Sequence, residues 1–218
     1  MKLNEYIDHT FLRPTGTLAD IDTLIDEAIQ YQFKSVCVHP VFVPHCRQRL
    51  EGTGVLVCTV VGFPLGQNTT ATKVFETLNA IHNGADEIDM VINIGDAKMG
   101  HWERIKEEID EVVKAAGNHL VKVIIETCYL SKEEIIEVSK TVAKTQAGFI
   151  KTSTGFGPEG AKVEDVKLMK EYGAGKEVKA SGGVRSQADL VAMIQAGATR
   201  IGTSSGVKLL RDEHGDGY

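Results

Sequence analysis

The chain has 218 residues, of which 42% are hydrophobic, and its 24 Lys and Arg against 30 Asp and Glu give a formal net charge of −6. Basic residues are spread among acidic ones, which argues against a nucleic-acid partner because phosphate neutralisation needs a concentrated basic face. No apolar run approaches the roughly 18 residues of a membrane span, and the N-terminus has acidic residues, Glu5 and Asp8, where a signal peptide would have its apolar segment. We therefore expect a cytoplasmic protein with no membrane partner, and one domain over residues 1–218.

Neither the cysteines nor the histidines form a metal-binding pattern. The four cysteines are Cys37, Cys46, Cys58 and Cys128, and no two of them make a C-x-x-C pair. This spacing favours buried, reduced thiols over a disulfide framework or a zinc cage. The seven histidines are scattered without ligand spacing, so no metal site is predicted.

Eight short apolar segments predict β-strands along the whole chain. They cover residues 6–9, 35–38, 55–61, 87–92, 121–126, 148–151, 177–180 and 199–202. Between the first two, Thr17 and Asp20 resemble a capping box, and apolar residues from Ile21 to Ile29 follow at helical spacing. Similar capping pairs, Ser131 with Glu134 and Ser186 with Asp189, open later helices. Strands and helices are thus expected to alternate.

The strand segments indicate a parallel sheet covered on both faces. Residues 55–61 and 121–125 are nearly continuous in hydrophobicity, as expected where both faces are buried. Eight strand-helix units in 218 residues leave about 27 residues for each, which suits a single (β/α)8 TIM barrel. An open, doubly wound sheet is the alternative, weakened because no G-x-G-x-x-G follows the first strand. The polar tail, at about residues 212–218, is typical of a frayed terminus.

Polar residues at the ends of the predicted strands mark a candidate site, because the chemistry of such barrels lies at the C-terminal ends of the strands. Lys151 and Lys179 stand on neighbouring strands, and Asp89 lies across the barrel. Like-charge repulsion and burial lower the pKa of a lysine, and a neutral amine can attack a carbonyl. We expect Asp89 to pair with the lysine that stays protonated. The alternative is that both lysines are solvated at the rim.

Glycines, serines and threonines after the last three strands suggest an anion-binding site. The candidate residues are Thr152, Gly155, Gly182, Gly183, Gly202, Ser204 and Ser205. Backbone amides exposed by glycine, together with hydroxyl groups, bind phosphate, and barrels often hold a phosphate after strands seven and eight. A phosphorylated substrate is therefore suggested, although glycine and serine are also common in ordinary turns.

Two further residues at strand ends are candidates for the pocket. Asp8 could organise its floor or act as a turn acceptor, and Cys37 could form part of its wall. Glu126 could orient the ligand or a lysine, or could pair with Lys122 or another charge at the rim.

With these residues in place, the sequence resembles the deoxyribose-phosphate aldolases over nearly the whole chain. The resemblance lies in seven blocks in the same order, at residues 7–10, 35–38, 61–66, 87–95, 122–127, 149–157 and 178–185. It implies a class I lyase that reversibly cleaves 2-deoxy-D-ribose 5-phosphate to acetaldehyde and D-glyceraldehyde 3-phosphate, in the catabolism of deoxyribonucleotides. It also implies an imine at one lysine and no metal or other cofactor.

The resemblance assigns roles to the candidate residues. Lys151 matches the Schiff-base lysine, Lys179 the second catalytic lysine and Asp89 the proton-relay aspartate, while the glycines and serines match the phosphate site. The sequence departs from the family pattern at His39, where we expect asparagine, and at Arg13, where lysine is usual. Tyr218 is a possible counterpart of the C-terminal tyrosine of the family.

Small phosphorylated sugars and aldehydes are the expected ligands, and a homodimer is possible. Two other functions remain open on the sequence alone: another barrel enzyme that acts on a phosphorylated sugar, and a barrel that binds sugar phosphates without catalysis.

Overall fold

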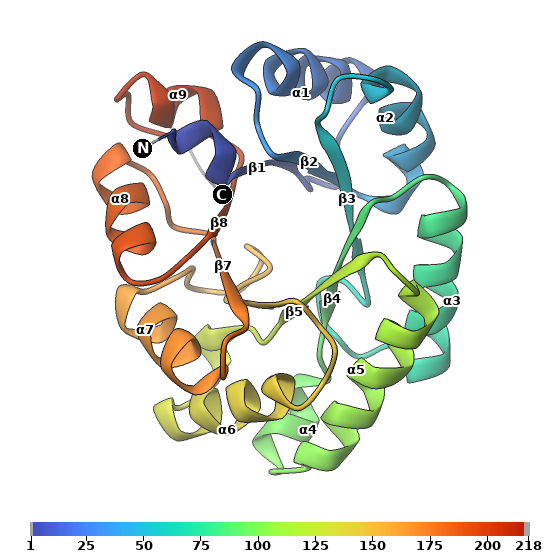
Figure 1. Ribbon diagram of the computed structural model, residues 1–218, viewed down its shortest axis with the longest axis vertical. Coiled ribbons are helices and arrows are strands. Elements are labelled where there is room, and N and C mark those ends of the chain that lie inside the picture. Colours follow the sequence, from blue (N-terminus) through green and yellow to red (C-terminus); the bar gives the residue numbers. More distant parts are fainter. Residues whose placement is uncertain (1, 216–218) are drawn as a thin grey trace.

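The computed structural model describes residues 2–215, and its eight parallel strands close into a barrel in the order β1 to β8 (Figure 1). The strands are β1 (Ile7–Phe11), β2 (Ser35–Val38), β3 (Leu56–Val61), β4 (Glu87–Val91), β5 (Leu120–Ile124), β6 (Phe149–Lys151), β7 (Glu177–Ser181) and β8 (Arg200–Thr203). The predicted (β/α)8 barrel is confirmed, and the open sheet is excluded because β1 pairs with β8.

Helices connect the strands and form the outer ring of the barrel (Figure 1). They are α1 (Leu18–Tyr31), α2 (Val43–Leu50), α3 (Thr70–His82), α4 (Ile94–Lys98), α5 (Trp102–Ala116), α6 (Lys132–Ala143), α7 (Val163–Tyr172), α8 (Gln187–Gln195) and α9 (Gly206–Leu210), with 3-10 turns η1 (Leu3–Tyr6), η2 (Pro40–Phe42) and η3 (Thr127–Tyr129). The three predicted capping boxes open α1, α6 and α8. Within residues 2–215, none of the helices has the length and apolarity to span a bilayer.

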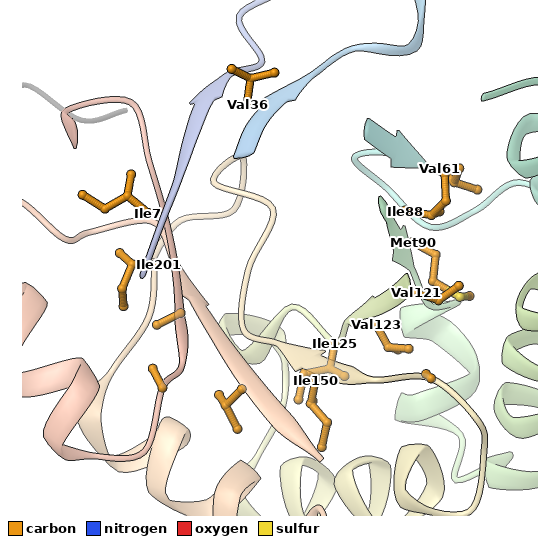
Figure 2. Packing of buried hydrophobic residues seen from close by; sticks show 14 of the residues in the cluster. Ile7, Val36, Val61, Ile88, Met90, Val121, Val123, Ile125, Ile150 and Ile201 are labelled. Carbon is orange, nitrogen blue, oxygen red and sulfur yellow. The ribbon is translucent and has the colours of Figure 1, made fainter. Parts of the chain in front are cut away.

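Alternate residues of each strand pack against the helices and form the main core. Figure 2 labels ten members of this set: Ile7, Val36, Val61, Ile88, Met90, Val121, Val123, Ile125, Ile150 and Ile201. The same cluster contains helix residues such as Ile21, Ile25 and Ile109, all fully buried. Because the side-chain period of a strand is two, the residues between these apolar ones face the inside of the barrel.

The inward-facing set is highly charged. Its charged members are Asp8, Glu87, Asp89, Lys122, Lys151, Lys179 and Arg200, and each is at most 5% exposed. Buried charges are stable only when they are paired. The barrel interior is therefore where the polar chemistry of this chain is concentrated.

The described part of the C-terminal tail is attached to the barrel. The backbone amide of Glu213 donates to the carbonyl of Lys208 at 2.8 Å, and that of Gly215 donates to the carbonyl of Arg185 at 2.7 Å. Up to Gly215 the tail is thus hydrogen-bonded, in contrast to the frayed terminus expected.

Candidate active site

Lys151 and Lys179 lie side by side inside the barrel. They are register partners on β6 and β7, and they are 3% and 0% exposed. Their Nζ atoms contact the same oxygen, Oδ2 of Asp89, at 2.7 Å and 2.8 Å. Both lysines are buried beside the same carboxylate, so the alternative in which both are solvated at the rim is wrong.

A third lysine, Lys122, completes the set of cations around Asp89. Its Nζ lies 2.8 Å from Oδ1 of Asp89 and 2.7 Å from Oε2 of Glu87. The suggestion that Lys122 is a rim charge paired with Glu126 is wrong, because Lys122 is fully buried on β5. The signal in the sequence was a single lysine within an apolar strand, which has to point inward when its neighbours face the helices.

Asp8 and Arg200 form the floor beneath this cluster. Asp8 contacts the Nζ of Lys179 through Oδ2 at 2.5 Å, and its Oδ1 accepts from the hydroxyl of Ser35 at 2.7 Å. Arg200 donates to Oδ1 of Asp8 at 2.5 Å and binds both carboxylate oxygens of Glu87 at 2.9 and 3.0 Å. Asp8 thus organises the floor, and it does not line the pocket described below.

The network shifts the pKa values of Asp89 and Lys179. Burial alone would raise the pKa of Asp89, but three neighbouring ammonium groups outweigh burial and hold that pKa well below its usual range. Burial alone would lower the pKa of Lys179, but the carboxylates of Asp8 and Asp89 raise it above its usual value. Lys179 therefore stays protonated, while Asp89 stays ionised. Asp89 pairs with all three lysines and not with one alone.

A pocket opens above Lys151 at the C-terminal ends of the strands. Its lining consists of Thr10, Leu12, Lys151, Thr154, Gly155, Ser181, Gly182, Gly183, Val184, Gly202, Thr203 and Ser204. Lys151 is the lysine of the cluster that reaches this lining, while Lys179 and Asp89 lie beneath it. An aldehyde in the pocket would meet the amine of Lys151 first.

One side of the pocket consists of the predicted glycines. Gly182 and Gly183 have consecutive positive φ values of 76° and 74°, a conformation that residues with a Cβ rarely adopt. Among the described residues, the hydroxyl oxygens of Ser153 and Ser181 are buried and have no hydrogen-bond partner. Ser181 lines the pocket, so its hydroxyl is available to a bound ligand. Ser181 was not singled out as a site residue from the sequence.

Besides Asp8, three of the predicted binding residues lie outside the pocket lining. The Thr152 hydroxyl accepts from the backbone amide of Ser181 at 3.0 Å and thus joins the ends of β6 and β7. Ser205 lies in a separate recess beside His9. Cys37 is fully buried in a small wall cluster with Leu12. Tyr218 lies outside the described residues.

The two departures from the family pattern also lie outside the lining. The His39 ring donates through Nε2 to the carbonyl of Leu12 at 2.8 Å, and so contacts the main chain of a residue that lines the pocket. Arg13 lines the recess beside His9.

One group of potential metal ligands is present in the described part of the chain. The ligand atoms of Cys37, Cys58 and Asp89 lie within 4.8 Å of one another. However, the Nζ of Lys122 contacts Cys58 Sγ at 3.3 Å and Asp89 Oδ1 at 2.8 Å. An ammonium group thus already occupies the place of a cation, and the donor set does not fit a metal unless Lys122 moves.

Comparison with known proteins identifies a family and several relatives of this chain. Residues 3–215 match the model of the DeoC/LacD family aldolases. Over the full length of this chain and 98% of the relative, the sequence is 57% identical to the deoxyribose-phosphate aldolase of Acholeplasma laidlawii. It is also 57% identical to deoxyribose-phosphate aldolase 1 of Staphylococcus aureus, over 99% of both chains. The tetrameric deoxyribose-phosphate aldolase structure from Aeropyrum pernix superposes with a TM-score of 0.90 at 34% identity, covering 96% of this chain and 89% of that one.

Proposed function

The chain belongs to the DeoC/LacD family of aldolases, which are lyases, and we propose that it cleaves 2-deoxy-D-ribose 5-phosphate to acetaldehyde and D-glyceraldehyde 3-phosphate through an imine at Lys151. The observation that carries this proposal is the position of Lys151, whose amine lines the pocket while its Nζ contacts Asp89 at 2.7 Å. The substrate is the one named for the relatives, and the pocket glycines support a phosphorylated one.

The reaction begins at Lys151. This residue first loses its proton to solvent at the mouth of the barrel. Its free amine then adds to the aldehyde carbon of the open-chain sugar and forms a carbinolamine. Lys179, which is protonated at rest, supplies the proton with which the carbinolamine hydroxyl leaves as water, relayed through Asp89. The product is a cationic imine on Lys151, and Lys179 is left as a neutral amine.

The cationic imine then accepts the electrons of the breaking bond. The neutral amine of Lys179 takes the proton of the C3 hydroxyl, relayed by Asp89 and a water molecule, while the C2–C3 bond breaks. D-Glyceraldehyde 3-phosphate leaves, and an enamine remains on Lys151. Lys179 returns the proton to C2, and water hydrolyses the new imine to release acetaldehyde. A last proton transfer from Lys151 to Lys179 leaves Lys179 protonated and Lys151 as a free amine, ready to add to the next substrate.

Asp89 acts in this scheme as a relay and an orienting group. Its low pKa makes it a poor base, but its Oδ2 atom contacts both reacting lysines. The iminium supplies the polarisation that zinc provides in metal-dependent lyases. We therefore propose a reaction without metal or other cofactor.

The phosphate group would bind at the other side of the pocket. The segments around Gly155, Gly182 and Gly202, together with Ser204, provide backbone amides and hydroxyls there. Binding at this distant group orients the reacting carbons above Lys151, and such orientation contributes several kcal/mol, up to about 7–11, toward the barrier.

The setting of the enzyme is also part of the proposal. We infer a cytoplasmic role in the catabolism of deoxyribonucleotides, since the breakdown of deoxyribonucleotides yields this sugar phosphate. We infer a homodimer because large apolar side chains remain exposed on α3, with Phe75 at 69% and Leu78 at 52%. Light scattering coupled to size-exclusion chromatography tests the assembly, and a strictly monomeric protein would contradict it.

The function is tested by product analysis. Purified protein is incubated with 2-deoxy-D-ribose 5-phosphate, and acetaldehyde and D-glyceraldehyde 3-phosphate are each quantified by coupled NADH oxidation. We expect both products in equal amounts, and none from the Lys151→Leu variant. A protein that binds the sugar phosphate but releases neither product would be a binding barrel, and one that forms a single isomeric product would be an isomerase.

A further inference from the structure

We propose that Glu126 is a positioning residue that holds the loop after β6 in the shape required for binding the substrate phosphate. This inference rests on the proposed aldolase function, since it assigns Thr154 and Gly155 to the phosphate end of the pocket. Glu126 does not line the pocket itself, so it acts through Thr154.

The backbone of Glu126 has an unusual conformation. Its φ and ψ of 53° and 67° lie in the left-handed region, which residues other than glycine seldom adopt. Such a conformation persists where the surroundings enforce it, and it is frequent near functional sites. It ends β5 two residues earlier than the apolar pattern predicts, and it turns the chain into η3.

The carboxylate of Glu126 accepts a long hydrogen bond from the thiol of Cys128, at 3.9 Å, and its short hydrogen bonds come from one residue of the neighbouring loop. Glu126 is 2% exposed, and both of its oxygens accept from the backbone amide of Thr154, at 3.1 and 3.2 Å. Its Oε2 also accepts from the hydroxyl of Thr154. The same hydroxyl accepts from the amide of Phe156 at 3.0 Å. Glu126 therefore holds residues 154–156 through one chain of hydrogen bonds.

The segment held in this way forms part of the pocket. Thr154 and Gly155 belong to the lining, three and four residues after Lys151 on the same connection. Gly155 has a φ of 89°, so the loop turns sharply there. Without the carboxylate, the buried amide of Thr154 would lose its acceptor, and the loop would have to rearrange to satisfy it. This rearrangement would weaken phosphate binding but would leave the reactivity of the Lys151 amine unchanged.

The test compares Glu126→Gln and Glu126→Leu with the unmodified enzyme. Glutamine preserves the volume and one acceptor oxygen, but its amide nitrogen donates and cannot accept from Thr154. Three quantities are measured: kcat and KM for 2-deoxy-D-ribose 5-phosphate, the dissociation constant of inorganic phosphate by calorimetry, and the rate of borohydride trapping of acetaldehyde on Lys151. Glu137→Gln, an exposed glutamate on α6, is the matched control.

We expect Glu126→Leu to raise KM and the phosphate dissociation constant by roughly ten- to a hundredfold, the range that corresponds to losing a hydrogen bond to a charged group. We expect Glu126→Gln to show a smaller rise in both. Acetaldehyde trapping should keep its original rate in both variants, because acetaldehyde carries no phosphate.

Several results would overturn the inference. One is an unchanged phosphate affinity in folded Glu126→Leu or Glu126→Gln. Another is a parallel loss of phosphate affinity and acetaldehyde trapping, which would indicate a general structural role. A third is an unmodified protein that does not bind inorganic phosphate. A protein whose phosphate affinity depends on Glu126, but that neither cleaves the sugar phosphate nor traps acetaldehyde, would refute the proposed function alone.

Discussion

Replacing Asp89 with asparagine removes the charge on which three lysines converge, while it preserves the side-chain volume. The three Nζ···O distances are 2.7, 2.8 and 2.8 Å, and none of the four residues is more than 3% exposed. Breaking a buried ion pair from one side costs about 3–5 kcal/mol, because the partner charge stays buried without compensation. For a chain of this length each kcal/mol lowers Tm by roughly 2–4 °C, so the expected fall is roughly 6–20 °C.

The same substitution should reduce catalysis at a defined step. Loss of a proton relay lowers kcat by about 10²–10⁴, whereas the reduced acetaldehyde adduct at Lys151 should still form on prolonged incubation because the nucleophile is intact. Calorimetry, a coupled cleavage assay and mass spectrometry measure the three effects. Glu137→Gln, which breaks an exposed pair with Lys140, should change stability by no more than about 0.5 kcal/mol. An Asp89→Asn protein that melts and cleaves like the unmodified enzyme would refute the reasoning.

Three other predictions follow from the same network and pocket. Gly182→Ala places a Cβ 3.1 Å from Gly160 at a φ of 76°, and the resulting strain of roughly 1–2 kcal/mol should raise KM about 5–30-fold. The control is Gly175→Ala, at a φ of 89° with open space around it, which should lower stability but leave KM unchanged. The lowered pKa values of Asp8 and Asp89 contribute stability that is present above about pH 4 and lost as pH falls further, and the raised pKa of Lys179 contributes stability that is lost only above about pH 10. In urea unfolding, the free energy of unfolding should therefore not change with pH between pH 5 and 9 on account of this network. A pH dependence in that range that Asp89→Asn abolishes would contradict the pairing. Dialysis against EDTA should leave turnover unchanged, since the iminium polarises the substrate. A loss of turnover on dialysis that an added divalent cation restores would count against the mechanism.

The barrel itself could be predicted from the sequence because its determinants are local. Capping pairs such as Ser131 with Glu134 set the helix starts, and the apolar period sets the strands. The end of β5 could not be predicted in this way. Ile125 continues the apolar run in the sequence and Glu126 follows it, but Glu126 has a left-handed backbone and its side chain binds Thr154, 28 residues away.

The candidate site was predictable in its position but not in its charge balance. Lys151, Lys179 and Asp89 stand at strand ends, where barrel chemistry is found. Their protonation depends on which inward residues close the network, and this is a property of the register across the barrel. Arg200 and Glu87, which meet at 2.9 Å across the floor, are 113 residues apart in the chain. No local pattern connects them, so the excess of carboxylates around Lys179 emerged only from the closed structure.

The most direct test of the central claim is to reduce the protein with sodium borohydride in the presence of acetaldehyde and to sequence its peptides by mass spectrometry. The account predicts one added ethyl group, located on Lys151, and none on Lys122 or Lys179, which do not line the pocket. An active preparation that carries no adduct, or that carries it on another lysine, would contradict the claim that Lys151 forms the imine.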